Sequence, residues 1–240
     1  MSKGVIIAFA KTPGVSPLKT RLAATIGQDQ AEIFYRLSVK ATEEYLEMAC
    51  ALEPNLEPRW GLAEVAGFSN ELWKNFEVYP LRGLGLGERL GNAYENLLSE
   101  FERVFFIGTD SPHLDPNIFS AAWNALNQNE FVLGRTDDGG FYLFGGRVPI
   151  QPHHWGAIEY SSDKTAEQLI KEFSTLGRFH ELPREFDVDT KKDLLKLRKH
   201  LEQRRQTKIT EQPSCGTALT NTDEKILQFI ETLSPFLLEE

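Results

Sequence analysis

The sequence predicts an α/β fold with a mostly parallel central sheet, and three observations lead to this prediction. Residues 5–10 and 104–107 are apolar throughout, as in strands that are buried on both faces. Apolar residues at three- and four-residue spacing follow these runs and indicate helices between the strands. The 240 residues are 41% hydrophobic and 25% charged, which is the composition of a globular chain that can bury a sizeable core.

Charge and cysteine content exclude several classes of function. The net charge is −9, and no lysine-rich run is long enough to follow a nucleic-acid backbone, so we expect no nucleic-acid partner. Residues 5–10 are too short for a signal segment or a membrane span. Cys50 and Cys215 lie too far apart for a metal-binding spacing, and reduced thiols in the cytoplasm are the simpler interpretation.

The first loop carries positive charge. Ser16 is a candidate N-cap with Pro17 at the first helical position, so a helix is predicted from residue 16 to 26. The loop and the opening turns of this helix contain one glycine and three cations, namely Gly14, Lys11, Lys19 and Arg21. A helix N-terminus beside cations favours an anion, although neither a Walker loop nor a dinucleotide fingerprint is present. Phosphate binding and a solvated basic turn both stay open.

Further elements follow in order. Helices are predicted at residues 29–50, 69–76, 90–101, 116–126, 161–173, 190–201 and 223–238, and strands at 59–63, 77–81 and 178–182. The glycines of residues 82–89 alternate, so this loop can approach a ligand closely or serve as a plain flexible turn. Residues 131–146 form a predicted hairpin around Asp137 and Asp138, which are either turn residues or carboxylates displayed at the sheet edge.

Carboxylates mark the expected site. Asp110 follows the central strand, which ends because Pro112 cannot donate a hydrogen bond to a sheet. In open α/β sheets ligands bind at the carboxyl ends of the strands, where an aspartate can hold a divalent cation against a phosphate. Asp187 and Asp189 alternate on an extended piece and face the same way. They either cap the next helix, or one of them is a second ligand of the same cation.

Five segments, in this order, resemble a family of bacterial glycosyltransferase-like proteins with the nucleotide-diphospho-sugar transferase (GT-A) fold, a group associated with arsenosugar biosynthesis. The segments are FAKTPGVSPLKTRLA (9–23), GLGERL (85–90), FFIGTDSPHL (105–114), LGRTDDGGFYLFG (133–145) and FDVDTKKDL (186–194). The resemblance covers most of residues 4–200. Molybdenum-cofactor and phospholactate guanylyltransferases resemble the chain more distantly.

The resemblance implies a three-layer α/β/α fold with a mostly parallel, mixed sheet. It also implies magnesium or manganese at Asp110 and Asp189, and contact of Asp137 and Asp138 with the sugar or acceptor. Asp138 is the candidate general base if the reaction inverts. The implied nucleotide and phosphate contacts are Lys11, Gly14, Lys19, Arg21, Gly85, Gly87, Glu88 and Arg89.

The leading hypothesis is a metal-dependent glycosyltransferase that acts on a nucleotide-diphospho-sugar donor and a small acceptor. The alternatives are nucleotidyl transfer to a phosphorylated small molecule, with pyrophosphate release, and non-catalytic binding of a nucleotide sugar. We expect a transferase domain at residues 1–205, then a linker from 206 to 220 and an amphipathic helix. That helix either docks on the domain or mediates self-association into a homo-oligomer.

Overall fold

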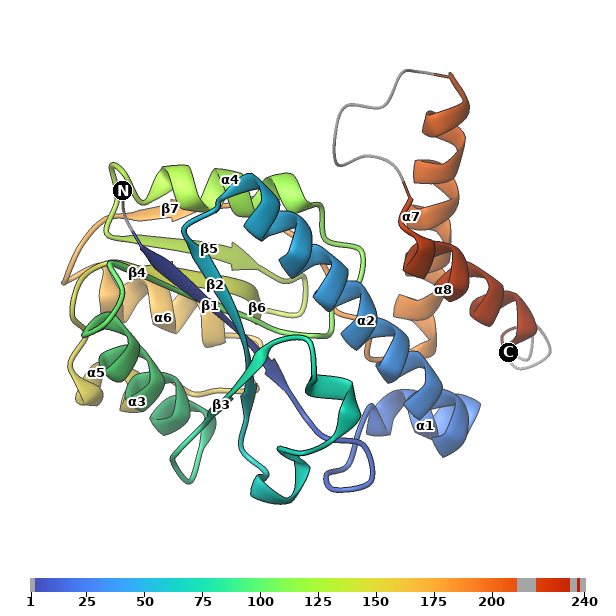
Figure 1. The fold of residues 1–240 in the computed structure, drawn as a ribbon, viewed down its shortest axis with the longest axis horizontal. Coiled ribbons are helices and arrows are strands. Elements are labelled where there is room, and N and C mark those ends of the chain that lie inside the picture. Colours follow the sequence, from blue (N-terminus) through green and yellow to red (C-terminus); the bar gives the residue numbers. More distant parts are fainter. Residues whose placement is uncertain (1–2, 211–218, 234–236, 238–240) are drawn as a thin grey trace.

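Within residues 3–210, 219–233 and 237, which the computed structural model describes, seven strands form one sheet between layers of helices (Figure 1). The sheet order is β3 (Glu77–Pro80), β2 (Leu56–Leu62), β1 (Gly4–Ala10), β4 (Arg103–Ile107), β6 (Phe141–Gly146), β5 (Phe131–Arg135) and β7 (Phe179–Glu181). Strand β6 runs antiparallel to both of its neighbours, and the other pairs are parallel. The predicted three-layer, mostly parallel mixed sheet is therefore confirmed.

Alternate side chains of the central strands enter two different cores, as a buried sheet requires. On one face, Ile6 and Phe105 pack with residues of α2 (Gln28–Leu52) and α4 (Pro116–Ala125). On the other face, Val5 and Phe106 pack with α3 (Leu86–Leu98), α5 (Pro152–Gly156) and α6 (Thr165–Phe173). The apolar runs in the sequence are explained by this two-sided burial.

A third core joins the first and last helices. Residues of α1 (Thr20–Ile26), α2, α7 (Lys191–Thr210) and α8 (Asn221–Thr232) pack together, with Val188 fully buried among them. Helix α8 lies on α2, where the rings of Phe34 and Phe229 stack at 6.2 Å and Thr222 donates to Glu44 at 2.6 Å. The C-terminal helix therefore docks on the body of the protein. The division at residue 205 stays a prediction.

Several predicted boundaries are wrong; the helices predicted at 90–101 and 161–173, for example, are Leu86–Leu98 and Thr165–Phe173. Helix α1 begins at Thr20, because the Ser16 hydroxyl donates to Glu64 at 2.5 Å instead of capping a helix. In place of the helix predicted at residues 69–76 there is one short 3-10 turn, η2 (Glu71–Trp73), which follows another, η1 (Val65–Gly67). Helix α7 continues through Thr210, so the predicted linker does not start at residue 206, and residues 211–218 of it lie outside the described part. None of the described helices has the length and apolarity needed to cross a bilayer.

Candidate functional site

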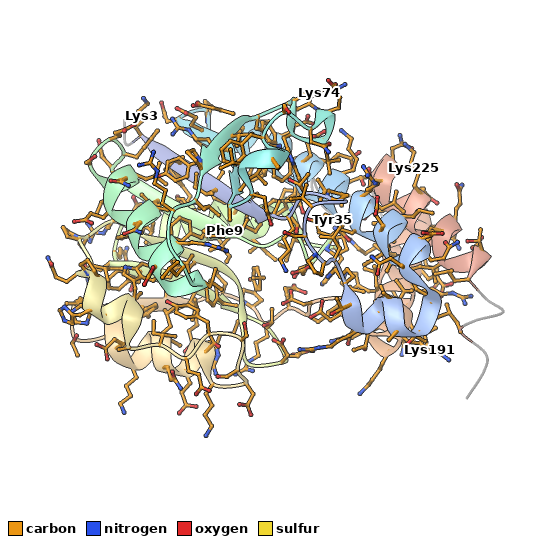
Figure 2. The ribbon with its side chains drawn as sticks, turned by 90° about the horizontal axis from the view of Figure 1, so that it is seen from below. Lys3, Phe9, Tyr35, Lys74, Lys191 and Lys225 are labelled. Atoms are coloured by element: carbon orange, nitrogen blue, oxygen red, sulfur yellow. The ribbon has the colours of Figure 1, made fainter. Side chains whose placement is uncertain are left out.

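The site lies at the carboxyl edge of the parallel strands. Strands β1 and β4 are parallel neighbours, so the loops that follow Ala10 and Ile107 leave the sheet side by side. The extended segment 186–189 joins them, because the Val188 amide donates to the Asp110 carbonyl at 2.9 Å. Figure 2 views the molecule from below Figure 1, the side toward which β1 runs, and labels Phe9 on that strand. Chain topology thus brings three distant segments to one edge.

Lys19 ties these segments together. Its ammonium pairs with Asp110, lies 3.1 Å from Asp189 and donates to the Val188 carbonyl at 2.8 Å. Only 3% of the Lys19 side chain is exposed, against 47% for Asp110 and 38% for Asp189. Burial lowers the pKa of Lys19, but the two carboxylates outweigh it and the pKa is raised, so this lysine stays charged.

Backbone strain also points to a functional site around Lys19. Lys19 has φ 43°, in the left-handed region that side chains other than glycine rarely adopt. Ser161, with φ 60°, also lines this site. Strained residues are retained where the surrounding contacts hold them, often at functional sites.

A basic cavity of about 610 Å³ opens beside the Lys19 cluster. Its charged lining residues are four cations and three carboxylates, Lys11, Lys19, Arg21, Arg89, Glu64, Asp110 and Asp189. The Tyr35 hydroxyl holds the loop at Lys11, since it accepts from the Lys11 amide at 2.8 Å and donates to the Lys11 carbonyl at 2.9 Å. Burial raises the pKa of Tyr35 to about 12. This clasp fixes the loop that carries Lys11 against α2.

A second cavity of about 420 Å³ adjoins the first and shares Arg21, Asp110 and Asp189 with it. It adds Asp138 and Asp187 and a largely aromatic wall. Ser111 donates to the Asp187 carboxylate, and burial together with the charge of Asp110 raises the pKa of Asp187 to about 7. The alternation of Asp187 and Asp189 in the sequence indicated that these two carboxylates belong to the site. No sequence pattern indicated that Tyr35 or Ser161 belongs to it.

The predicted site residues divide into two groups. Lys11, Lys19, Arg21, Arg89, Asp110, Asp138 and Asp189 line one or both cavities. Asp137 points elsewhere and pairs with Lys196 at 2.6 Å. Four predicted residues are not among the described lining residues: Gly14 lies in a turn, Gly85 is the N-cap of α3, and Gly87 and Glu88 lie in the first turn of α3. Glu88, for example, accepts from the Leu84 amide at 2.8 Å.

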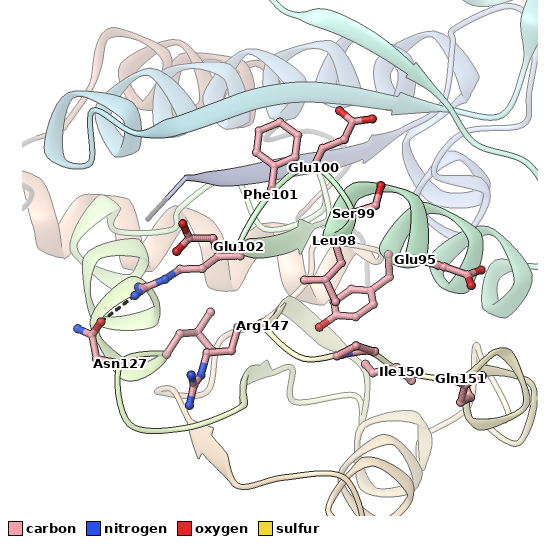
Figure 3. Close-up of a pocket in the computed structure, with 14 residues that line it drawn as sticks. Glu95, Leu98, Ser99, Glu100, Phe101, Glu102, Asn127, Arg147, Ile150 and Gln151 are labelled. Atoms are coloured by element: carbon pink, nitrogen blue, oxygen red, sulfur yellow. Dashed lines mark hydrogen bonds between the residues drawn. The ribbon is translucent and has the colours of Figure 1, made fainter. Parts of the chain in front are cut away.

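A larger cavity, of about 800 Å³, lies at the opposite edge of the sheet, near Arg103 at the start of β4 (Figure 3). Both of its arginines are already engaged. The guanidinium of Arg103 donates to the Trp123 carbonyl at 2.6 Å and to Asn127 at 2.7 Å, and that of Arg147 donates to the Asn129 carbonyl and to Glu130, each at 2.8 Å. Because ligands of open α/β sheets bind at the carboxyl edge, we take the two cavities around Lys19 as the candidate site.

The donor set can be tested against a divalent cation. Among the described residues, no three carboxylate, imidazole or thiol groups gather closely enough to hold a metal by themselves. Magnesium, however, is usually bound through one or two carboxylates together with substrate phosphates and water. Asp110 and Asp189 are partly exposed, and Lys19 contacts one oxygen of each. Their remaining oxygens therefore suit a cation that arrives with a phosphorylated ligand.

Comparison with known proteins places the fold. A family model described as "Uncharacterized protein conserved in bacteria (DUF2064)" matches residues 40–162, just over half of the chain. No curated protein sequence matches. Among solved structures, a "putative nucleotide-diphospho-sugar transferase" from Desulfovibrio desulfuricans G20 is similar, with TM-score 0.76 and 22% identity over 99% of this chain and 97% of that one.

Two nucleotide-related or metal-bound structures are also similar. CMP:2-keto-3-deoxy-manno-octonic acid synthetase complexed with CTP matches with TM-score 0.52 and 15% identity, over 84% of this chain and 99% of that one. Rv0371c from Mycobacterium tuberculosis H37Rv, in complex with manganese, matches with TM-score 0.50 and 15% identity, over 81% and 97% of the two chains. At these identities the matches establish a shared fold.

Proposed function

The chain belongs to the DUF2064 family, and we propose that it is a metal-dependent glycosyltransferase that moves a sugar from a nucleotide-diphospho-sugar to a small acceptor. One observation carries the proposal: Asp110 and Asp189 converge on Lys19 between a basic cavity and an acidic, aromatic one. The basic cavity suits the diphosphate of the donor, and the second cavity suits the donor sugar and the acceptor. The fold shared with a nucleotide-diphospho-sugar transferase supports this assignment.

In the proposed step an acceptor hydroxyl oxygen bonds to the anomeric carbon of the donor sugar. The bond from that carbon to the diphosphate breaks, and its electron pair leaves with the nucleoside diphosphate. The hydroxyl proton passes to Asp138, which lines the second cavity. One oxygen of Asp138 accepts from Thr136 at 2.6 Å and from the Gly140 amide at 3.1 Å, so the carboxylate is held in place. A single displacement of this kind inverts the anomeric centre.

The basic residues have distinct roles in this proposal. Lys11, Arg21 and Arg89 bind diphosphate oxygens and stabilise the charge that develops as the nucleoside diphosphate leaves. Each N–H of Lys19 already has a protein partner, so Lys19 positions Asp110 and Asp189. Magnesium or manganese bound by these two carboxylates would neutralise further negative charge on the diphosphate. The manganese complex of Rv0371c supports this choice of metal.

Nucleotidyl transfer is the second candidate, because the similar synthetase is complexed with CTP. There a phosphorylated small molecule attacks the α-phosphate of a nucleoside triphosphate, and pyrophosphate leaves. The same basic cavity would serve either reaction. Binding of a nucleotide sugar without chemistry is the third possibility.

One experiment separates these functions. The protein is incubated with manganese and a panel of nucleotide sugars, or with nucleoside triphosphates and phosphorylated sugars and alcohols. Release of a nucleoside diphosphate that is lost in Asp110→Asn supports the proposal. Pyrophosphate release would favour nucleotidyl transfer, whereas binding with neither product would favour a binding protein. A cytoplasmic location remains part of the proposal, whereas the docked α8 gives no support to self-association through that helix.

A further inference from the structure

The two adjoining cavities differ in charge. The basic cavity is lined by four cations and three carboxylates, whereas the second is lined by one cation, Arg21, and five carboxylates, Asp110, Asp138, Asp163, Asp187 and Asp189. Arg21 is shared by both cavities. Two of the carboxylates, Asp110 and Asp189, are partly neutralised by Lys19. The remaining three face the second cavity without a cation of their own among its described lining residues.

The second cavity is also apolar. Seven apolar or aromatic side chains contribute to its wall, Phe9, Leu86, Leu90, Phe106, Ile107, Phe141 and Tyr160. The Tyr160 ring is held in this wall because its hydroxyl donates to the Trp155 carbonyl at 3.2 Å. Leu86 is 40% exposed, so its side chain is accessible to a ligand in this cavity. The wall therefore suits the apolar body of a ligand, with carboxylates beside it to accept hydrogen bonds.

We propose that the second cavity takes an acceptor with an apolar or aromatic body whose hydroxyl-bearing end is neutral or cationic, and that it rejects phosphorylated acceptors. A phosphate in this cavity would face Asp138 and Asp163, and like charges brought together at a binding site cost affinity. A hydroxyl can instead donate to a carboxylate, and an ammonium is attracted by it. This inference rests on the proposed glycosyl transfer, and it disfavours transfer of a nucleotide to a phosphorylated molecule.

The leucines of the two cavities allow a test that resolves the site without requiring activity. Leu90 lines the second cavity alone, whereas Leu18 and Leu81 line the basic cavity alone. Leucine methyl groups labelled with ¹³C report binding at each cavity through their NMR shifts. The probes are benzyl alcohol, 2-amino-1-phenylethanol and benzyl phosphate, in buffer with EDTA so that no metal bridges phosphate to a carboxylate.

Benzyl alcohol and 2-amino-1-phenylethanol are expected to shift Leu90. Benzyl phosphate is expected to shift Leu18 and Leu81, and to need at least a tenfold higher concentration than benzyl alcohol to shift Leu90. In the double variant Asp138→Asn, Asp163→Asn this discrimination should fall at least fivefold. Asp29→Asn is the matched control, since it removes a carboxylate from the exposed start of α2, and it should leave the discrimination unchanged.

Two outcomes would overturn the inference. One is that benzyl phosphate shifts Leu90 at a concentration equal to, or lower than, the concentration at which benzyl alcohol shifts it. The other is no Leu90 response to benzyl alcohol at all. Because the readout is binding to the metal-free protein, it is independent of the nucleotide-sugar assay. Absence of nucleoside diphosphate release would defeat the proposed function, and the Leu90 response separately decides the acceptor class.

Discussion

The ammonium of Lys19 lies 3.1 Å from Oδ1 of Asp189, a residue 170 positions later in the chain. Because this ammonium also pairs with Asp110, its removal leaves two carboxylates without their shared counter-charge. Lys19→Met is therefore expected to lower the free energy of unfolding by about 1–3 kcal/mol, less than for a fully buried pair because both carboxylates are partly exposed. Urea denaturation measures it. Lys74→Met, at an exposed pair on the surface, is the control and should change stability by less than about 0.5 kcal/mol.

Metal dependence is predicted to appear only together with the nucleotide. Manganese plus a bound nucleotide sugar at about 100 times its Kd should stabilise the protein by roughly 2.7 kcal/mol, or about 5–10 °C in Tm. EDTA should remove most of this shift, and Asp110→Asn and Asp189→Asn should lose the part that depends on manganese. A shift that survives in both variants would contradict the assignment of the cation to these carboxylates.

The neighbours Asp137 and Asp138 are predicted to differ in their effect on catalysis. Asp138 lines the second cavity, whereas Asp137 pairs with Lys196 outside both cavities. Asp138→Asn should lower kcat about 100-fold or more, as expected for loss of a general base. Asp137→Asn should change kcat less than about threefold. Equal losses in the two variants, measured by initial rates, would contradict the role of Asp138.

Gly139 is predicted to be essential for the wall of the second cavity. Its φ is 91°, and a Cβ at this position would lie 1.8 Å from the Asp163 carbonyl oxygen. Gly139→Ala must therefore separate the hairpin turn from the loop before α6, at a cost of about 3 kcal/mol or more. Gly156→Ala is the matched control, because a Cβ there meets nothing within 4 Å and a helix favours alanine. Thermal unfolding compares the two variants.

Acid is predicted to destabilise the fold through His200. Burial, with the neighbouring charges of His113, Arg204 and Lys196, lowers the pKa of His200 to about 4. Between pH 6.5 and about 4, His200 is protonated in the unfolded chain but not in the folded chain. The contribution of neutral His200 to the free energy of unfolding is therefore complete above pH 6.5 and is lost as the pH falls to about 4. His200→Gln should flatten the pH dependence of unfolding in this window, by at most about 1.4 kcal/mol per pH unit.

His180→Gln is the control for that measurement, since His180 is exposed and lies on the edge strand β7. An unchanged slope in His200→Gln between pH 4 and 6.5 would show that other groups dominate the acid sensitivity.

Much of the fold could be predicted because its signals are local. The buried strands β1 and β4 are apolar in every central position, and Asp115 caps α4 with Pro116 at its first position, as the sequence indicates. The start of α1 could not be predicted in this way. Ser16 has the local signature of an N-cap, but its hydroxyl is taken by Glu64, 48 residues away.

The site could be predicted only in part, for a similar reason. The positions of Asp110 and Lys19 after one strand and before one helix are visible in the sequence. The burial of Asp187 and the clasp of Tyr35 on Lys11 depend on how α2 and residues 186–189 pack, which no nearby residue pattern encodes.

The docking of α8 on α2 has a practical consequence. Helix α2 holds the Lys11 loop through Tyr35 and contacts α8 through Phe34, so the C-terminal helix and the loop at the candidate site are both packed on α2. A protein or tag fused after α8 can therefore disturb the packing of α8 on α2. The start of β1 at Gly4, by contrast, lies a whole strand away from the edge that carries the candidate site (Figure 1). Purification handles and fluorescent reporters therefore belong ahead of β1.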